Sequence, residues 1–170
     1  MKIKVETERL LIRELQNIDE NDFFEMDSDP EVHKYIDNNP VKTIEEVRAT
    51  IEIFKKYETI FAVVDKNTNE CIGWSGLRFC SETINNKSNF YELGYRFKRK
   101  HWGKGFATES GKAIINFGFA NMKIDKIIAV TNAKNENSKK VLHKLNFSYV
   151  ESFIDEGQSN DWFELKNQTF

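Results

Sequence analysis

The sequence has few of the residues that build metal sites and disulfide frameworks. Cys71 and Cys80 are its only two cysteines, and its three histidines, His33, His101 and His143, are scattered singly along the chain. Neither set has the short, paired spacing of metal ligands, so we expect no metal site. Both thiols are expected to pack as small apolar side chains.

Long hydrophobic runs are also missing. Hydrophobic residues make up 39% of the 170 residues and charged residues 31%, which is ordinary for a soluble protein. No apolar stretch approaches the ~20 residues of a membrane helix, and the first fifteen residues lack the apolar core of a signal peptide. We therefore expect one domain over residues 1–170, located in the cytoplasm and without a membrane partner.

Charge is distributed unevenly along the chain. Residues 1–60 carry nine Lys and Arg against fifteen Asp and Glu, a net −6, whereas residues 98–145 carry eleven against three, a net +8. The positive block favours a small polyanionic ligand with one charged head. Because no aromatic-interleaved basic motif or nucleic-acid module is present, we do not expect nucleic acid as a partner.

Residues 91–119 change from strand to helix periodicity around a basic, glycine-containing turn. Apolar side chains alternate with other residues over 91–97, which predicts a half-buried strand. After Gly105 the apolar positions recur at helical spacing, which predicts a helix that ends near residues 121–122. The turn between them, residues 98–105, holds four of the block's Lys and Arg residues.

This turn has the features of an anion site. Gly103 and Gly105 let the backbone approach a ligand, and the first N–H groups of the helix point into the turn. A solvated connection remains an alternative for an isolated turn. A P-loop would need Lys and Ser/Thr where Phe106 and Ala107 stand, and a dinucleotide fingerprint would need a third glycine near Thr108. The pattern that remains is a phosphate site entered from a strand.

The rest of the chain predicts further strands and helices. Turn residues separate strands at 8–13, 60–65, 71–79, 126–131, 147–153 and 162–165. Helices are predicted over 19–28, over 44–57 after a capping box formed by Thr43 and Glu46, and over 138–145 before Asn146. This order predicts an α/β (α+β) domain with a mixed sheet and helices on both faces.

Four stretches of the sequence resemble the GNAT N-acetyltransferases. They read ETERLLIREL at 6–15, IGWSGL at 72–77, YELGYRFKRKHWGKGFATES at 91–110 and NENSKKVLHKLNF at 135–147. The closest likeness is to the branch of the RimJ/RimL-type ribosomal-protein N-terminal acetyltransferases. The family's loop usually begins with Gln or Arg, whereas this one begins with Lys100. Leu142 stands where many members carry a tyrosine. The resemblance implies a GNAT fold, with a mostly antiparallel sheet of six to seven strands and a splayed central cleft.

The resemblance also implies acetyl-CoA as the cofactor. The pyrophosphate loop would comprise Lys100, His101, Trp102, Gly103, Lys104, Gly105, Phe106, Ala107 and Thr108, with the N–H groups of residues 101–106 as the main donors. Backbone groups of Leu93, Gly94, Tyr95 and Phe97 would receive the pantetheine arm and the thioester oxygen. Asn135 and Ser138 would contact the cofactor from the late helix, where Asn135 is also a favourable N-cap.

Acetyl transfer to an amine needs a base for the amine and a proton for the departing thiolate. By resemblance Glu92 is the candidate base, and an exposed strand carboxylate is the alternative interpretation of the residue. Ser138, another group or water would protonate the thiolate, whose thiol has a pKa near ~8.5. With no activated Cys or Ser nucleophile evident, we expect direct attack in a ternary complex.

Aromatic residues are the candidates for the acceptor pocket. By analogy with the family they are Phe24, Tyr35, Trp74 and Phe163, although core packing is the more ordinary role for each. The acceptor would be a primary amine, either of a small molecule or of a protein N-terminus. A non-catalytic acyl-CoA-binding module of the same fold is the alternative function, and the chain could be a monomer or a homodimer.

Overall fold

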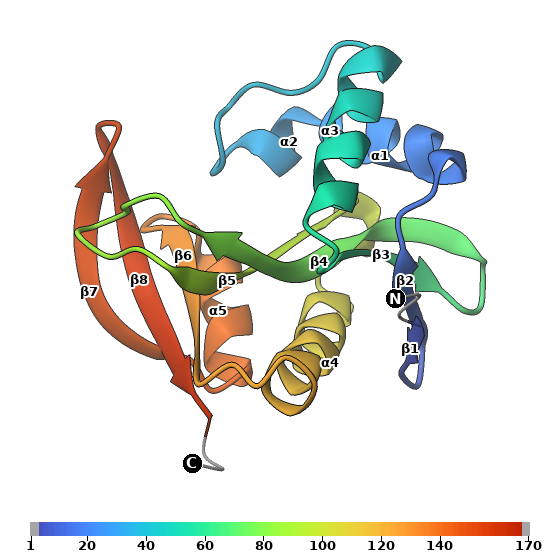
Figure 1. The fold of residues 1–170 in the computed structure, drawn as a ribbon. Coiled ribbons are helices and arrows are strands. Elements are labelled where there is room, and N and C mark those ends of the chain that lie inside the picture. The colour runs from blue at the N-terminus through green and yellow to red at the C-terminus, as the bar shows by residue number, and fades with distance from the viewer. Residues whose placement is uncertain (1–3, 168–170) are drawn as a thin grey trace.

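The computed structural model describes residues 4–167 and shows one twisted sheet between two layers of helices (Figure 1). The strands are β1 (Lys4–Glu6), β2 (Leu10–Glu14), β3 (Ile60–Asp65), β4 (Glu70–Cys80), β5 (Phe90–Phe97), β6 (Lys126–Asn132), β7 (Ser148–Asp155) and β8 (Gln158–Lys166). The helices are α1 (Glu20–Asp27), α2 (Pro30–His33), α3 (Ile44–Lys56), α4 (Phe106–Ala120) and α5 (Glu136–Lys144), with short 3₁₀ turns at Asn17–Asp19 and Arg99–His101.

The sheet is mixed and mostly antiparallel, as predicted. Its strand order is β1-β2-β3-β4-β5-β6-β8-β7. Among the described strands β5 and β6 form the one parallel pair, and every other neighbouring pair is antiparallel. The count of eight strands exceeds the six to seven expected, because the three-residue β1 is too short for its alternation to stand out among charged residues.

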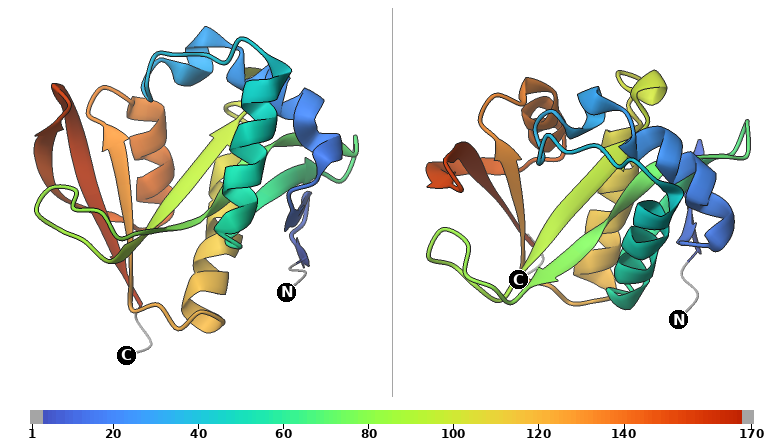
Figure 2. Two further views of the ribbon diagram at one scale, coloured as in Figure 1. Left: turned by 45° about the horizontal axis from the view of Figure 1, so that its top comes forward. Right: turned by 90° about the horizontal axis from the view of Figure 1, so that it is seen from above.

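Each face of the sheet is covered by its own helices. Helices α1, α2 and α3 lie on one face, and α4 and α5 lie on the other (Figure 2). The first layer buries Phe23, Met26, Val47 and Ile51 against β3 and β4. The second layer buries Ile114, Ile115, Leu142 and Leu145 against the central strands. The alternating side chains of β5 therefore belong to two different surroundings, one for each face.

The predicted helix caps are present. Thr43 Oγ1 accepts from the N–H of Glu46 at 3.3 Å, which begins α3. The Glu46 carboxylate accepts from the N–H of Lys42 at 2.8 Å, one residue before the N–H expected of a capping box. Asn135 caps α5, and Asn146 has a left-handed φ of 63° just after its end.

The last hairpin is tighter than the sequence suggested. Asp155 pairs with Gln158, so Glu156 and Gly157 form a two-residue turn, whereas the predicted strands ended at 153 and began again at 162. Both have positive φ, 46° and 78°, as a tight turn between twisted strands requires. The two strands consequently extend further toward the turn than predicted. Within residues 4–167, no helix is long and apolar enough to cross a membrane.

Candidate active site

Strands β5 and β6 separate along most of their length. They pair only at Tyr91 with Ile127 and Glu92 with Ile128, although β5 continues to Phe97. The N–H of Lys98 donates to Ile72 of β4 at 3.0 Å. Because successive peptide groups of a strand point to opposite edges, the peptide groups of Leu93, Tyr95 and Phe97 face the β6 side. The expected splay is confirmed, and it leaves one edge of β5 open.

Of the four β5 residues assigned to the cofactor, Gly94 and the carbonyl of Phe97 do not offer a free backbone group. By the same alternation the peptide group of Gly94 faces β4, where Gly94 pairs with Gly76. The carbonyl of Phe97 already accepts from the Trp102 indole N–H at 2.8 Å. Leu93 and Tyr95 therefore carry the open edge, and the assignments of Gly94 and of the Phe97 carbonyl are corrected.

The turn after β5 presents a run of free N–H groups at the start of α4. Gly103 and Gly105 have φ of 74° and 85°, a conformation that favours glycine. Within residues 4–167, the N–H groups of residues 103–108 donate to no backbone or side-chain group. Those of His101 and Trp102 donate to Lys98 and Arg99, which corrects the expected donor set of 101–106. Free N–H groups at a helix N-terminus suit a phosphate.

The side chains of this turn divide between core and solvent. Phe106 is 7% exposed and packs with Leu10 and Phe97, so it offers a ligand only its N–H. Ala107 and Thr108 are half-buried in the first turn of α4, and Lys104 is exposed at the mouth of the turn. The turn therefore has the buried Phe106 ring on its core side and the exposed Lys104 side chain on its solvent side.

Arg9 contacts the turn, and it was not among the residues predicted for the site. Its guanidinium donates to the Lys104 carbonyl at 2.9 Å, pairs with Glu109 at 2.7 Å and lies 4.5 Å from the centre of the Phe106 ring. Glu109 also accepts from Thr7 Oγ1 at 2.5 Å. Thr7 and Arg9 both lie in the first family-like stretch, 6–15, which was the available signal. Their contacts fix the turn against the start of β2.

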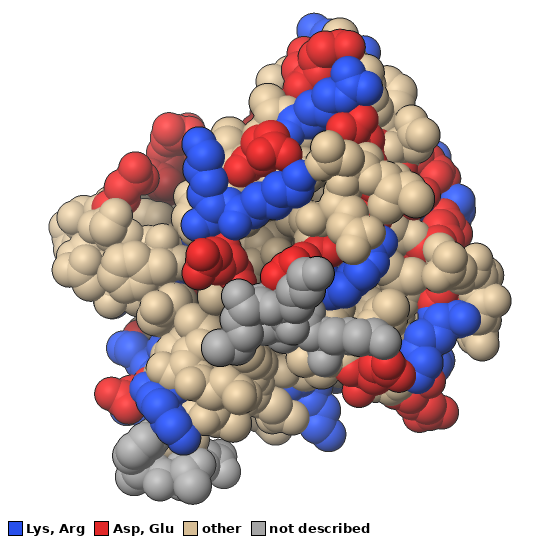
Figure 3. Space-filling view, turned by 45° about the vertical axis from the view of Figure 1, so that its right-hand side comes forward, with Lys and Arg blue, Asp and Glu red and all other residues tan. Residues whose placement is uncertain are grey.

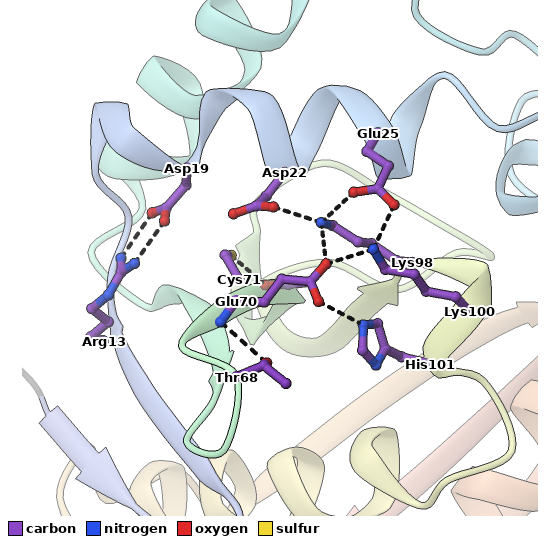
Figure 4. A network of polar contacts seen from close by, with 11 residues as sticks. Arg13, Asp19, Asp22, Glu25, Thr68, Glu70, Cys71, Lys98, Lys100 and His101 are labelled. Atoms are coloured by element: carbon purple, nitrogen blue, oxygen red, sulfur yellow. Dashed lines mark hydrogen bonds and ion pairs between the residues drawn. The ribbon is translucent and has the colours of Figure 1, made fainter.

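Several basic side chains of the turn face away from the free N–H groups. The Lys98 ammonium contacts Asp22, Glu25 and Glu70 at 2.6–2.7 Å, and Lys100 contacts Glu25 and Glu70 at 2.8 Å (Figure 4). The charge asymmetry of the sequence is therefore partly cancelled, because the acidic N-terminal region pairs with the basic turn. On the face in Figure 3, blue and red side chains lie beside one another. The expected role of the Lys100 side chain at a phosphate is not supported by this geometry.

Glu70 is the centre of this cluster. Burial opposes its ionisation, but hydrogen bonds from Lys100 and Lys98 outweigh that effect and lower the pKa of Glu70 to about 2. Its other oxygen lies 3.3 Å from His101 Nε2. The His101 ring is 9% exposed and thus belongs to the acidic cluster, and its N–H is used within the turn. Hence His101 contributes neither its ring nor its N–H to the phosphate position.

Helix α5 forms the other wall of the open edge. Asn135 Oδ1 accepts from the N–H of Ser138 at 3.1 Å, which confirms its capping role. Ser138 Oγ lies 3.0 Å from the Tyr95 hydroxyl, so a hydrogen bond joins β5 to α5. Burial raises the pKa of Tyr95 to about 12, which keeps the phenol protonated. Leu142, at the position of the family's tyrosine, is 1% exposed and lies in the core.

Glu92 lies on the opposite face of β5, towards α1–α3. Its Oε2 accepts from Arg78 Nη2 at 2.7 Å and from the Cys80 thiol at 3.5 Å. Within the described part of the chain, Oε1 has no hydrogen-bond partner. Burial and the charge of Glu92 raise the pKa of Cys80 to about 11, so Cys80 remains a thiol. One carboxylate oxygen is thus held and the other is available.

The aromatic residues assigned to the acceptor do not all meet. Phe24 packs half-buried on α1, and Tyr35 follows α2 with Lys34 over its ring at 5.6 Å. Trp74 packs edge-on against Phe54, with ring centres 5.0 Å apart. Phe163 is 1% exposed in the core beneath α4 and α5, on the other face of the sheet, so its assignment is wrong. Alternation along a strand is easily misassigned by one residue.

A cavity lies on the α1–α3 face beside the end of β5. It has a volume of about 510 Å³ and is polar. Its lining includes Asp27, His33, Asp37, Glu46, Phe54 and Arg96. Arg96 belongs to β5, so the cavity adjoins the strand whose other edge is open. Asp27, His33 and Arg96 were not predicted as site residues, because neither their residue types nor their spacing in the sequence indicates that they lie close together.

Comparison with known proteins agrees with this geometry. The acetyltransferase (GNAT) domain model matches residues 9–148. The uncharacterized N-acetyltransferase p20 of Bacillus licheniformis is 32% identical over 167 residues, which are 95% of this chain and 88% of that protein.

Solved structures share the fold. A GNAT-family acetyltransferase from Bacillus anthracis superposes with a TM-score of 0.83 at 27% identity, covering 96% of this chain and 98% of that one. A spermidine N-acetyltransferase from Vibrio cholerae, in complex with CoA and spermine, has a TM-score of 0.75 at 18% identity, covering 94% and 96%. The open edge of β5, the free N–H groups at α4 and the family match lead to one conclusion: this chain belongs to the GNAT family and is an acetyltransferase.

Proposed function

We propose that this enzyme transfers the acetyl group of acetyl-CoA to a primary amine by direct attack in a ternary complex. The observation that carries the proposal is the open edge of β5, which leads to the free N–H groups of residues 103–108. A pantetheine arm needs peptide partners along an extended path, and a pyrophosphate needs several donors at its end. The residues present fit both needs.

The N-terminus of α4 holds the charged end of the ligand in this proposal. The free N–H groups and the helix dipole favour negative charge there. Lys104 adds an exposed positive charge, while Arg9 and Glu109 keep the turn in place. The assignments of Gly103, Lys104, Gly105, Ala107 and Thr108 rest on this geometry.

The open edge of β5 orients the reactive end. Peptide groups of Leu93 and Tyr95 receive the pantetheine arm, and an N–H of this edge polarises the carbonyl to be attacked. Acetyl-CoA, when bound, supplies an acyl group that is activated as a thioester. Ser138, which is hydrogen-bonded to Tyr95, passes a proton to the departing sulfur and recovers one from water.

Glu92 acts on the acceptor in this proposal. Its free Oε1 attracts an ammonium and accepts a proton from it, directly or through water. Direct attack is supported by the state of the two cysteines. Burial raises the pKa of Cys71 to about 12, and Cys80 stays protonated as well, so neither provides a thiolate nucleophile.

Calorimetry with acetyl-CoA tests the first step of the proposal. We expect saturable binding, and no binding at millimolar acetyl-CoA would contradict the proposed function. Thiol release with a broad panel of amines and peptides then tests turnover. No turnover with any acceptor, despite tight binding of acetyl-CoA, would favour the alternative function, an acyl-CoA-binding module. The apolar Leu142 at the tyrosine position also favours this alternative.

The finer assignments belong to the same proposal. The family-like stretches support the RimJ/RimL branch and an acceptor that is either a small amine or a protein N-terminus. A cytoplasmic location and a monomeric or homodimeric state are likewise proposed, and size-exclusion chromatography with light scattering measures the latter.

A further inference from the structure

Arg78 and Glu92 lie directly opposite one another in β4 and β5, on the α1–α3 face of the sheet. Arg78 Nη2 donates to Glu92 Oε2 at 2.7 Å, and among the described residues this is the one hydrogen bond that the guanidinium makes. Its Nε and Nη1 groups therefore have no acceptor there. The Arg78 side chain is 48% exposed, so a ligand can reach these donors.

Glu92 also keeps one polar atom accessible. Its side chain is 16% exposed, and Oε1 has no hydrogen-bond partner in the described part of the chain. Oε1 is not one of the buried side-chain atoms that lack a partner, so solvent reaches it. The pair therefore offers a ligand a negatively charged oxygen and positively charged N–H groups that are joined by one hydrogen bond.

The pair is located where β5 and β6 separate. Glu92 pairs with Ile128 and is the last β5 residue to pair with β6. The open edge beyond it, from residue 93 to residue 97, is ~13 Å long at ~3.3 Å per residue. An extended ligand with its charged end at the free N–H groups of residues 103–108 would bring its far end to Glu92. The pair thus borders the place where, in the proposed function, the acyl group meets the acceptor.

A second pair of opposite charges on this face of β5 is closed to ligands. Arg96 Nη1 donates to Asp27 Oδ1 at 2.8 Å, but the Arg96 side chain is 16% exposed and that of Asp27 only 3%. The Arg78–Glu92 pair differs because its cation is the more exposed partner. Of the two pairs, it is the one that a ligand can contact with both of its charges.

We propose that Arg78 binds the carboxylate of an acceptor that is a zwitterionic α-amino acid, with the amine of this acceptor at Glu92 Oε1. This inference rests on the proposed function and names its acceptor class. An α-amino acid carries its two charges on neighbouring atoms of one short backbone, as the Arg78–Glu92 pair requires. A guanidinium suits a carboxylate, because its fork of donors matches two oxygens and it keeps its charge at every physiological pH.

Simple amines and polyamines match this pair less well. Arg78 repels any ammonium that approaches Glu92, and at 2.7 Å it cancels much of the attraction of the carboxylate. A ligand that carries only positive charge therefore gains little from the pair. A ligand with both charges meets an opposite charge at each end, and such complementarity favours one partner over another.

Kinetics with matched acceptors tests the assignment. The set comprises the most reactive α-amino acid of a panel, its amide, and the amine that lacks its carboxylate. In Arg78→Leu the kcat/KM for the amino acid should fall about tenfold or more relative to that for the amine, because only the amino acid loses a charged partner. Each value is divided by that of the unmodified protein, so the different basicities of the amines cancel.

Arg48→Leu is the matched control. Arg48 is 53% exposed and its Nε donates to Glu20 at 2.8 Å, so this variant removes a similar ion pair from α3. The ratio between amino acid and amine should be retained in it. Equal losses for all three acceptors in Arg78→Leu would show that Arg78 only positions Glu92, and equal losses for amino acid and amide would show that a carbonyl is sufficient. Either result would overturn the assignment, as would acetylation of amines but of no α-amino acid.

A binding experiment needs no turnover. With CoA present, N-acetylalanine should bind the unmodified protein about tenfold more tightly than it binds Arg78→Leu, in a titration followed by nuclear magnetic resonance. N-Ethylacetamide, which lacks the carboxylate, should bind both proteins equally. Equal affinities of the two proteins across a panel of N-acetyl amino acids would overturn the assignment. If acetyl-CoA binds but no amine reacts, the proposed function fails, and this titration still decides whether Arg78 binds a carboxylate.

Discussion

Glu92 illustrates how one side chain can be divided between structure and chemistry. Arg78 and Cys80 hold Oε2, while Oε1 has no partner among the described residues. An arginine at 2.7 Å neutralises much of the attraction that the carboxylate exerts on an ammonium. The catalytic hypothesis therefore depends on Oε1.

Replacing Glu92 tests this hypothesis. Glu92→Gln should lower kcat about a hundredfold at neutral pH, because the amide cannot accept a proton, while acetyl-CoA affinity stays unchanged. Stopped assays over a pH series and calorimetry measure the two effects. Cys80→Ala keeps the carboxylate and is the control. An unaltered pH–rate profile in Glu92→Gln would assign Glu92 to a structural role.

The hydroxyl pair of Tyr95 and Ser138 is a second residue-scale prediction. If the pair protonates the thiolate, Ser138→Ala and Tyr95→Phe should each lower kcat by about tenfold or more, with little change in KM for acetyl-CoA. Their effects should be less than additive in the double variant, because both act through one hydrogen bond. Fully additive losses of kcat would show that the two residues act independently.

At the scale of elements, the turn and α4 form the proposed anion site, and Arg9, the residue before β2, contacts it. Predicting this unit needed only the glycines and the change of periodicity, since both act locally. The direction of each basic side chain was not local, because Asp22, Glu25 and Glu70 come from α1 and β4. Lys104 is exposed and, unlike Lys98, Arg99 and Lys100, forms no ion pair with a described residue.

Charge reversal within one helical unit tests the anion site. Lys104→Glu should weaken acetyl-CoA binding about tenfold or more at low salt, because it adds a negative charge beside the pyrophosphate. Lys112→Glu makes the same change on the exposed side of α4 and is the matched control. Calorimetry measures both. Equal effects of the two variants would mean that only overall charge matters.

At the scale of the whole molecule, the acidic N-terminal region and the basic turn are joined by the Lys98 cluster. Lys98 is 2% exposed and contacts three carboxylates. Burial opposes its charge, but these carboxylates outweigh that effect and raise the pKa of Lys98. Removing one partner of such a buried set leaves an uncompensated charge, which is destabilising.

The cluster predicts how stability depends on pH. The pKa of Glu70 is about 2 in the folded protein against an ordinary 4.5. A lowered folded pKa stabilises the protein at pH values above the ordinary pKa, and this stabilisation, on the order of 2 kcal/mol after solvent screening, is lost as the pH falls from the ordinary pKa to the folded one. In Glu70→Gln the free energy of unfolding should be lower at neutral pH and fall less between these two pH values. Chemical unfolding over a pH series measures this, and Glu136→Gln, which removes an exposed carboxylate, is the control. Equal slopes of the unfolding free energy against pH in the two variants would contradict the prediction.

The sequence by itself determined the elements whose causes are local. The Thr43 cap, the Asn135 cap, the glycine turn and the alternation of β5 each depend on residues within one or two turns of chain. Most strand boundaries followed from such local patterns, and the GNAT fold was implied by the resemblance of four stretches to that family. The tertiary structure alone decided which groups meet, since Phe163 faces the core and Lys98 and Lys100 face acidic side chains. It also placed Arg78 beside Glu92, because such contacts depend on strand register and on helices far away in the sequence.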